Sequence, residues 1–90
     1  MYEIIFTKKY EKRSIKFFKK HSNLKTKYVK VINILKQNPY HPSLRLHKLQ
    51  GAMRDYYSIS LDLEYRIIID FVVVDKKIYL IDIGTHNEVY

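Results

Sequence analysis

Arg66 is the residue whose type and position best suit phosphate chemistry. It is the only basic residue in the apolar run 65–74, where a strand would hold its guanidinium as a rigid fork of donors. The alternative is a structural ion pair with Asp62, Glu64 or Asp70. The sequence leaves both interpretations open.

Two histidines are candidate proton carriers. His86 lies just after Gly84 in a segment too polar for a core, and imidazole is the usual proton carrier near neutral pH. His47 stands beside Lys48 in a long connecting segment, where both side chains could reach a nucleic-acid backbone or only water. Ordinary surface histidines would show the same spacing.

Tyrosines could contribute a phenol or an aromatic ring. Tyr90 follows Val89, which could pack on a sheet and turn the phenol toward the site, whereas a frayed chain end is the alternative. Three further tyrosines could stack on bases, although tyrosine in strands more often serves packing. They are Tyr56, Tyr57 and Tyr65.

The composition excludes several kinds of site. The chain has no cysteine, so disulfides, iron–sulfur clusters, thiolate zinc sites and a cysteine nucleophile are excluded. Its four histidines form no close i, i+4 pair, its carboxylates are scattered, and it has no glycine-rich phosphate loop. We therefore predict no metal site and no small-molecule cofactor.

The candidate residues fall in the half of the chain where hydrophobicity alternates with a period of two. From Asp55 onward the pattern predicts strands over 56–62, 65–74 and 78–83. If helices cover the apolar faces of these strands, the polar positions share the opposite face and could line one concave surface with His86. These positions are Ser58, Ser60, Arg66, Asp70 and Asp82.

A strand and two helices are predicted in the N-terminal half. Residues 2–6 are a β-branched and aromatic run, and Thr7 is placed to cap the helix that follows. That helix is amphipathic and strongly basic, and a second periodic stretch begins at Leu24 and ends at Asn38-Pro39. The two helices should form a hairpin.

Ninety residues suffice for one domain, residues 1–90. Residues 39–51 are predicted to form a loop that its leucines hold against the core. The element order is β-α-α-β-β-β. This order predicts an α+β fold with the helical hairpin packed on one face of an antiparallel sheet.

The charge is uneven along the chain. Lys and Arg number 17 against 9 Asp and Glu, and the excess lies in residues 1–54, whereas residues 55–90 are net acidic. Such a surface suggests a polyanionic partner, either nucleic acid or an acidic protein. The N-terminus resembles neither a signal peptide nor a membrane span, so a soluble cytoplasmic protein is expected, with no membrane partner. The predicted RNA contacts are Lys8, Lys9, Lys12, Lys16, Lys19, Lys20, Lys48, Arg54 and Tyr57.

Four segments of the C-terminal half resemble the RelE/ParE superfamily of bacterial toxins. They are Leu-His-Lys-Leu-Gln-Gly at 46–51, Tyr-Tyr-Ser-Ile at 56–59, Tyr-Arg-Ile-Ile-Ile at 65–69 and Ile-Gly-Thr-His-Asn-Glu-Val-Tyr at 83–90. The length, the element order and the basic helices fit the same outline over the whole chain. The mRNA-cleaving branch, with the RelE, YoeB and YafQ types, is the most similar.

The resemblance implies a toxin of a type II toxin–antitoxin pair, neutralised by an acidic antitoxin. Members of this branch enter the ribosomal A site and cut mRNA without metal, the RNA 2′-hydroxyl attacking its own phosphate. By resemblance, Arg66 stabilises the phosphate, and His86, His47 and Tyr90 take further catalytic positions. The pentacovalent phosphate would need a fixed positive charge, and the departing 5′-oxygen would need a proton donor.

The chain departs from the RelE type at one place. Ser58 and Ser60 stand where lysines are expected on the first strand of the meander, so His47 paired with His86 is the more plausible acid–base arrangement. Tyr57 or Asp62 could assist. Two other functions remain open: a ParE-like inhibitor of DNA gyrase and a non-catalytic module that binds RNA or an antitoxin.

Overall fold

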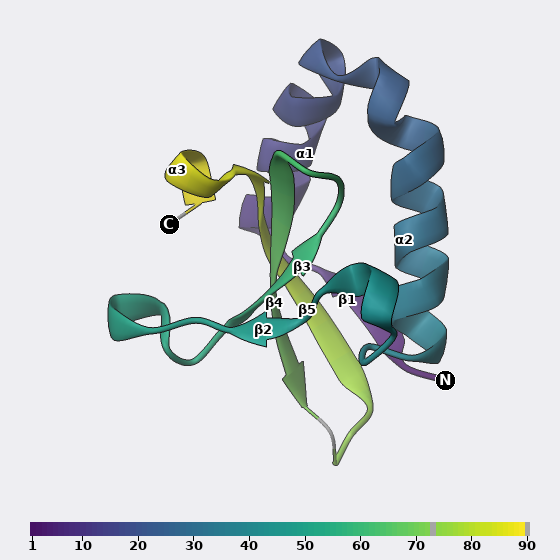
Figure 1. The fold of residues 1–90 in the computed structure, drawn as a ribbon, viewed down its shortest axis with the longest axis vertical. Helices are drawn as coiled ribbons and strands as arrows, with labels where there is room; N and C mark the ends of the chain where they lie inside the picture. Colours follow the sequence, from purple (N-terminus) through teal and green to yellow (C-terminus); the bar gives the residue numbers. More distant parts are fainter. Residues whose placement is uncertain (73, 90) are drawn as a thin grey trace.

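A five-stranded mixed sheet with two long helices against one face forms the framework of the computed structural model, which describes residues 1–72 and 74–89 (Figure 1). This confirms the predicted α+β class. The strand order is β1-β5-β4-β3-β2. The main elements are β1 (Glu3–Phe6), α1 (Lys8–Lys20), α2 (Lys25–Gln37), β2 (His47–Lys48), β3 (Tyr57–Ser60), β4 (Tyr65–Val72), β5 (Lys77–Thr85) and α3 (His86–Val89).

Local signals set the start and the packing of α1. Thr7 Oγ1 accepts a hydrogen bond from the Tyr10 amide at 3.2 Å, which confirms the predicted cap, and donates one to the Leu80 carbonyl at 2.6 Å. The Tyr10 ring is buried, and its hydroxyl lies 2.9 Å from that of Tyr28 on α2. The cap therefore joins α1 to β5, and the tyrosine pair joins the helices to each other.

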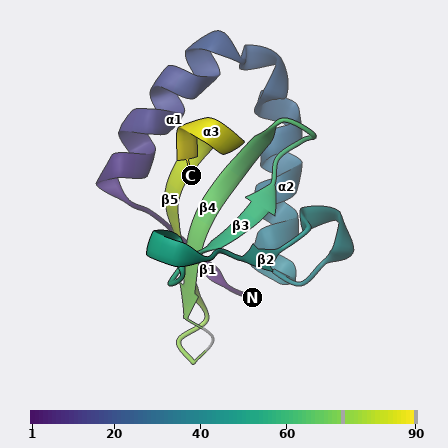
Figure 2. The same ribbon diagram turned by 60° about the vertical axis from the view of Figure 1, so that its left-hand side comes forward.

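The sheet carries a core on each face. Under α1 and α2 lies the main core, which includes Ile59, Ile67 and Leu80. The other face carries a smaller core of Leu49, Ile68 and Val89, covered by α3 and the segment before β3 (Figure 2). The expected concave surface is therefore only partly open.

Two short elements were not predicted. Strand β2 is only two residues long and lies within the segment 39–51 that was expected to be a loop. Helix α3 occupies the expected polar tail. Neither is long enough to produce a periodic pattern, so both depend on contacts with the sheet. Among the described residues, no helix is long and apolar enough to span a membrane.

Candidate active site

Strand register places the predicted residues in two neighbouring rows across the sheet. Arg66 on β4 lies opposite Ser60 on β3 and Gly84 on β5. In the next row Ser58 lies between His47 on β2 and Ile68 on β4. Residues directly opposite each other share a face, so these rows bring Arg66, Ser58 and His47 to the face turned away from α1 and α2.

Arg66 has an unmet hydrogen-bonding capacity. Its side chain is half-buried, and its Nη1 atom is buried without a hydrogen-bond partner among the described residues. Ser58 Oγ on the same face is in the same condition. An unpaired buried polar group costs about 1–3 kcal/mol, so such groups usually mark a place for water or a ligand. A guanidinium and a hydroxyl with free donors suit an anionic oxygen.

The ion-pair alternative for Arg66 has no support in the geometry. Within residues 1–72 and 74–89, no carboxylate lies within 4.0 Å of its guanidinium; both ion pairs that the structure holds involve Asp82. Asp62 instead accepts the backbone N–H groups of Glu64 and Tyr65 at 2.9 and 3.0 Å. Asp62 thus shapes the turn between β3 and β4.

His47 is exposed on the edge strand, in the row of Ser58. Its Nδ1 atom lies 3.4 Å from the carbonyl oxygen of Arg45. In the tautomer that protonates Nδ1, this contact leaves the Nε2 lone pair to accept a proton. In that tautomer His47 could act as a general base on this face.

Helix α3 begins with a capping box that the sequence analysis missed. The Thr85 amide donates to Glu88 Oε1 at 2.9 Å, and the Glu88 amide donates to Thr85 Oγ1 at 3.2 Å. The hydrogen bond from the Thr85 amide is the main reason that the pKa of Glu88 lies below its ordinary value, and the Thr85 side chain lowers it further. The signal in the sequence is Thr-His-Asn-Glu at 85–88, a threonine followed three residues later by a glutamate.

The capping box sets the position of His86, which is exposed at the first turn of α3. Val89 is 6% exposed and packs on Leu49 and Ile68, as the sequence suggested. Helix α3 can lie this close to the strand because Gly84 has no side chain. Tyr90 lies outside the described residues, so its predicted role stays a prediction.

Three of the predicted RNA contacts lie apart from Arg66. Tyr57 pairs with Lys48 across the strands, and its ring packs against the main core, on the face opposite Arg66. Lys48 is exposed at the sheet edge. Arg54 is also exposed and donates to the Gly51 carbonyl at 3.4 Å. These residues therefore do not join Arg66, Ser58 and His47 in one cluster.

Asp82 lies directly opposite Ile68, on the predicted face, but it does not line an open surface there. A register shift between Ile68 and Ile69 interrupts the β4–β5 pairing. Asp82 is 4% exposed and accepts Nε of Arg13 at 2.9 Å, with Nζ of Lys9 at 3.6 Å. This carboxylate therefore fixes α1 to β5 and is not open to a ligand.

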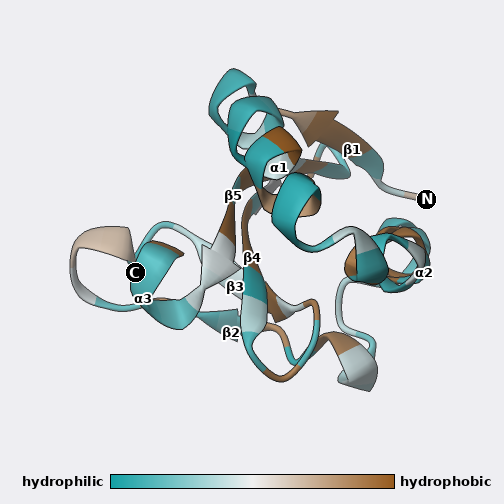
Figure 3. Cartoon of the chain, turned by 90° about the horizontal axis from the view of Figure 1, so that it is seen from above, coloured by the Kyte–Doolittle hydropathy of each residue, from teal (hydrophilic) through white to brown (hydrophobic). Residues whose placement is uncertain are grey.

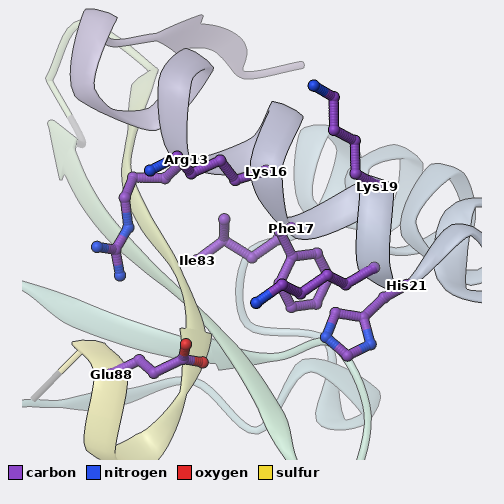
Figure 4. Close-up of a pocket in the computed structure, with 8 residues that line it drawn as sticks. Arg13, Lys16, Phe17, Lys19, His21, Ile83 and Glu88 are labelled. Atoms are coloured by element: carbon purple, nitrogen blue, oxygen red, sulfur yellow. The ribbon is translucent and has the colours of Figure 1, made fainter.

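Spacing along α1 produces a basic hollow that the sequence analysis did not identify. Arg13, Lys16 and Lys20 recur at intervals of three and four, so they share one face of α1, and this face meets α3 (Figure 4). The enclosed volume is about 420 Å³. We call this the α1–α3 hollow; its lining is Arg13, Lys16, Phe17, Lys19, Lys20, His21, Ile83 and Glu88.

The outer surface of α1 is strongly hydrophilic (Figure 3). Six of the seven lysines predicted to contact RNA are exposed on it: Lys8, Lys9, Lys12, Lys16, Lys19 and Lys20. Only Lys9 among these six reaches a described carboxylate within 4.0 Å. The surface can therefore attract a polyanion.

Comparison with solved structures identifies the fold. No protein-family model and no curated protein sequence matches the chain. A metal-bound toxin from Helicobacter pylori superposes with a TM-score of 0.82 at 23% identity, over 100% of both chains. The DinJ–YafQ complex of E. coli contains a chain that matches with a TM-score of 0.78 at 18% identity, over 100% of this chain and 99% of that one.

A YoeB/ParE toxin from Agrobacterium tumefaciens also superposes, with a TM-score of 0.75 at 18% identity, over 93% of this chain and 98% of that one. The chain has the RelE/YafQ-like toxin fold. This confirms the fold that the resemblance in the sequence implied. Within this toxin fold, Arg66 lies on the central strand β4, His47 lies on the edge strand β2, and His86 begins α3, whose Val89 packs on the same face.

Proposed function

We propose that this chain is the toxin of a type II toxin–antitoxin pair and cuts mRNA bound to the ribosome. The observation that carries the proposal is the buried, unpartnered Nη1 of Arg66, on the same face as Ser58 Oγ and His47. A phosphate oxygen would satisfy such donors. The structural similarity to a YafQ chain in complex with DinJ supports this class of protein.

In the proposed reaction the RNA supplies its own nucleophile. The 2′-oxygen attacks the adjacent phosphorus while His47 takes the 2′-hydroxyl proton. The phosphorus–5′-oxygen bond breaks, and His86 gives a proton to the departing oxygen. The products are a 2′,3′-cyclic phosphate and a 5′-hydroxyl. Arg66 stabilises the charge that develops on the phosphate oxygens, so this step calls for no metal.

The ribosome would supply the remaining geometry. A partly covered face with one arginine and two histidines does not by itself hold a flexible RNA in line for attack, whereas mRNA fixed in the A site is already positioned. The exposed lysines of α1 would contact ribosomal RNA, and in the resting cell they would attract an acidic antitoxin.

The deciding experiment uses purified ribosomes programmed with a defined mRNA. The wild-type chain should cut the mRNA and leave a 2′,3′-cyclic phosphate, and a 2′-deoxy nucleotide at the cut position should stop cleavage. Arg66→Ala should lose activity, whereas Lys30→Ala, which removes one exposed charge on α2, should keep it. Inhibition of DNA gyrase with intact mRNA would replace this proposal with the ParE-like function.

A further inference from the structure

The α1–α3 hollow concentrates positive charge in a confined space. Four cationic side chains line it against one carboxylate, Glu88. Glu88 is held by the capping box, and no lysine or arginine of the described chain lies within 4.0 Å of its oxygens. Arg13 is paired with Asp82, but Lys16, Lys19 and Lys20 reach no carboxylate of the described residues within 4.0 Å, so an anionic ligand would meet a net positive surface.

Arg13 is held in place before any ligand binds. The buried carboxylate of Asp82 accepts its Nε at 2.9 Å, and 39% of the arginine side chain remains exposed. In Figure 4 the guanidinium extends into the space between α1 and α3. An anchored guanidinium loses little side-chain entropy on binding, so its terminal N–H groups are ready for a phosphate.

An aromatic ring forms the opposite side of the hollow. The half-buried ring of His21 lies 4.6 Å from Phe17 and 4.7 Å from Tyr65, measured between ring centroids. These contacts fix the orientation of the imidazole at the end of α1, beside the hollow (Figure 4). Fixed cations beside an aromatic ring are the combination that binds single-stranded nucleic acid, through phosphate and base together.

We propose that the α1–α3 hollow binds one nucleotide of a single-stranded RNA, with its phosphate on Arg13, Lys16 and Lys20 and its base stacked on His21. The inference rests on the proposed function and adds a second RNA contact to it. Glu88, in the wall of the hollow, lies against Gly84, which is directly opposite Arg66. The nucleotide would therefore bind beside the cleavage site. An acidic protein segment would match the charges but would leave the ring of His21 unused.

Binding to naked RNA tests the inference without requiring cleavage. We would titrate a fluorescent single-stranded RNA, made uncleavable by 2′-O-methyl groups, with the whole chain and follow anisotropy at several salt concentrations. Lys16→Ala with Lys20→Ala should weaken binding about tenfold and lower the salt slope by about 0.7 for each phosphate that these lysines neutralise. The control pair is Lys27→Ala with Lys30→Ala, which removes the same charge from α2. Equally weakened binding by the two pairs would overturn the site.

The base contact has its own test. His21→Ala should weaken binding about tenfold, whereas His21→Phe should retain it, because a flat ring is what a base stacks on. Replacing single bases of the RNA by abasic positions should weaken wild-type binding at one position and leave the His21→Ala variant unaffected there. Equal sensitivity of both proteins at every position would refute stacking on His21.

The outcomes separate this inference from the proposed function. Loss of RNA binding in the hollow variants, with or without cleavage by the wild-type chain on ribosomes, supports the nucleotide site. If cleavage is lost only when Arg66 is replaced, and not in the hollow variants, the result concerns the active site alone. If the hollow variants bind RNA normally but lose affinity for an acidic peptide, the hollow is a protein-binding site and the inference is wrong.

Discussion

Replacing Gly84 with alanine should shift α3 on the sheet and weaken its attachment. A Cβ atom at this position would lie 3.1 Å from both Cβ and Oε1 of Glu88 and 3.3 Å from Cγ1 of Val89. Ordinary distances between such atoms are 3.4–4 Å, so the helix or the strand must move. Helix α3 is the weaker of the two, because it is four residues long whereas β5 pairs with β4 along its length and with β1 over Lys77–Leu80.

The size of the effect follows from what holds α3. Its attachments are one capping box, worth about 1 kcal/mol, and the burial of Val89, worth about 1.5–3 kcal/mol. Complete detachment of α3 would cost their sum, about 2.5–4 kcal/mol. A shift of α3 costs less than that, so Gly84→Ala should lower the free energy of unfolding by about 1–3 kcal/mol. Cleavage activity should fall by more than this loss of stability explains, because His86 moves with α3.

Urea denaturation would measure the loss of stability, and amide hydrogen exchange at Thr85 and Glu88 would report on the capping box. Gly51→Ala is the matched control: its φ of 67° strains an alanine, but an added Cβ meets nothing within 4 Å. That variant should lose about 1 kcal/mol and keep the exchange rates of α3. Wild-type stability and exchange in Gly84→Ala would refute the reasoning.

Three further predictions concern the chemistry and the pH dependence. Arg66→Ala should stay folded, and its rate of mRNA cleavage should fall roughly a hundredfold. His86→Ala should lose the alkaline limb of the pH–rate profile, and ribosome assays across a range of pH check both predictions. The hydrogen bonds from Thr85 lower the pKa of Glu88 in the folded chain, so the ionised carboxylate stabilises the fold above the unfolded pKa of about 4.5. This stabilisation disappears as the pH falls through the folded-state pKa, and Glu88→Gln should remove the acid dependence in urea melts at low pH. Burial raises the pKa of Tyr10, so stability should fall as the pH rises above about 10, where the unfolded tyrosine ionises and the folded one does not. Tyr10→Phe should make that fall smaller and cost about 1 kcal/mol at neutral pH through loss of the bond to Tyr28, as measured by urea melts at both pH values.

Signals within a few residues of each other determined the helices and strands. Thr7 caps α1 because its hydroxyl meets an amide three residues later, and α2 ends at Gln37, just before Asn38-Pro39. Alternation along 57–60 and 65–72 likewise appears as β3 and β4. These features need little beyond local geometry, so the sequence alone was sufficient to predict them.

The composition of the candidate site could be predicted only in part. Arg66 was identifiable because a single basic residue in an apolar strand is unusual. That it forms no ion pair with Asp62 or Asp70 could not be predicted, since ion pairing depends on how turns place the carboxylates. Ser58 was expected to line an open surface, yet its row is closed by Leu49 and Val89 from distant parts of the chain.

Only the tertiary structure decided the places of Asp82, α3 and the α1–α3 hollow. One register shift in the β4–β5 pairing accompanies the contact of Asp82 with α1, and no periodic pattern predicts such a shift. The hollow needs Arg13 and Glu88, which are 75 positions apart, to meet across β5. The sequence determined which elements form, whereas the packing of those elements determined which of their charges face one another, because contacts over such separations leave no local pattern.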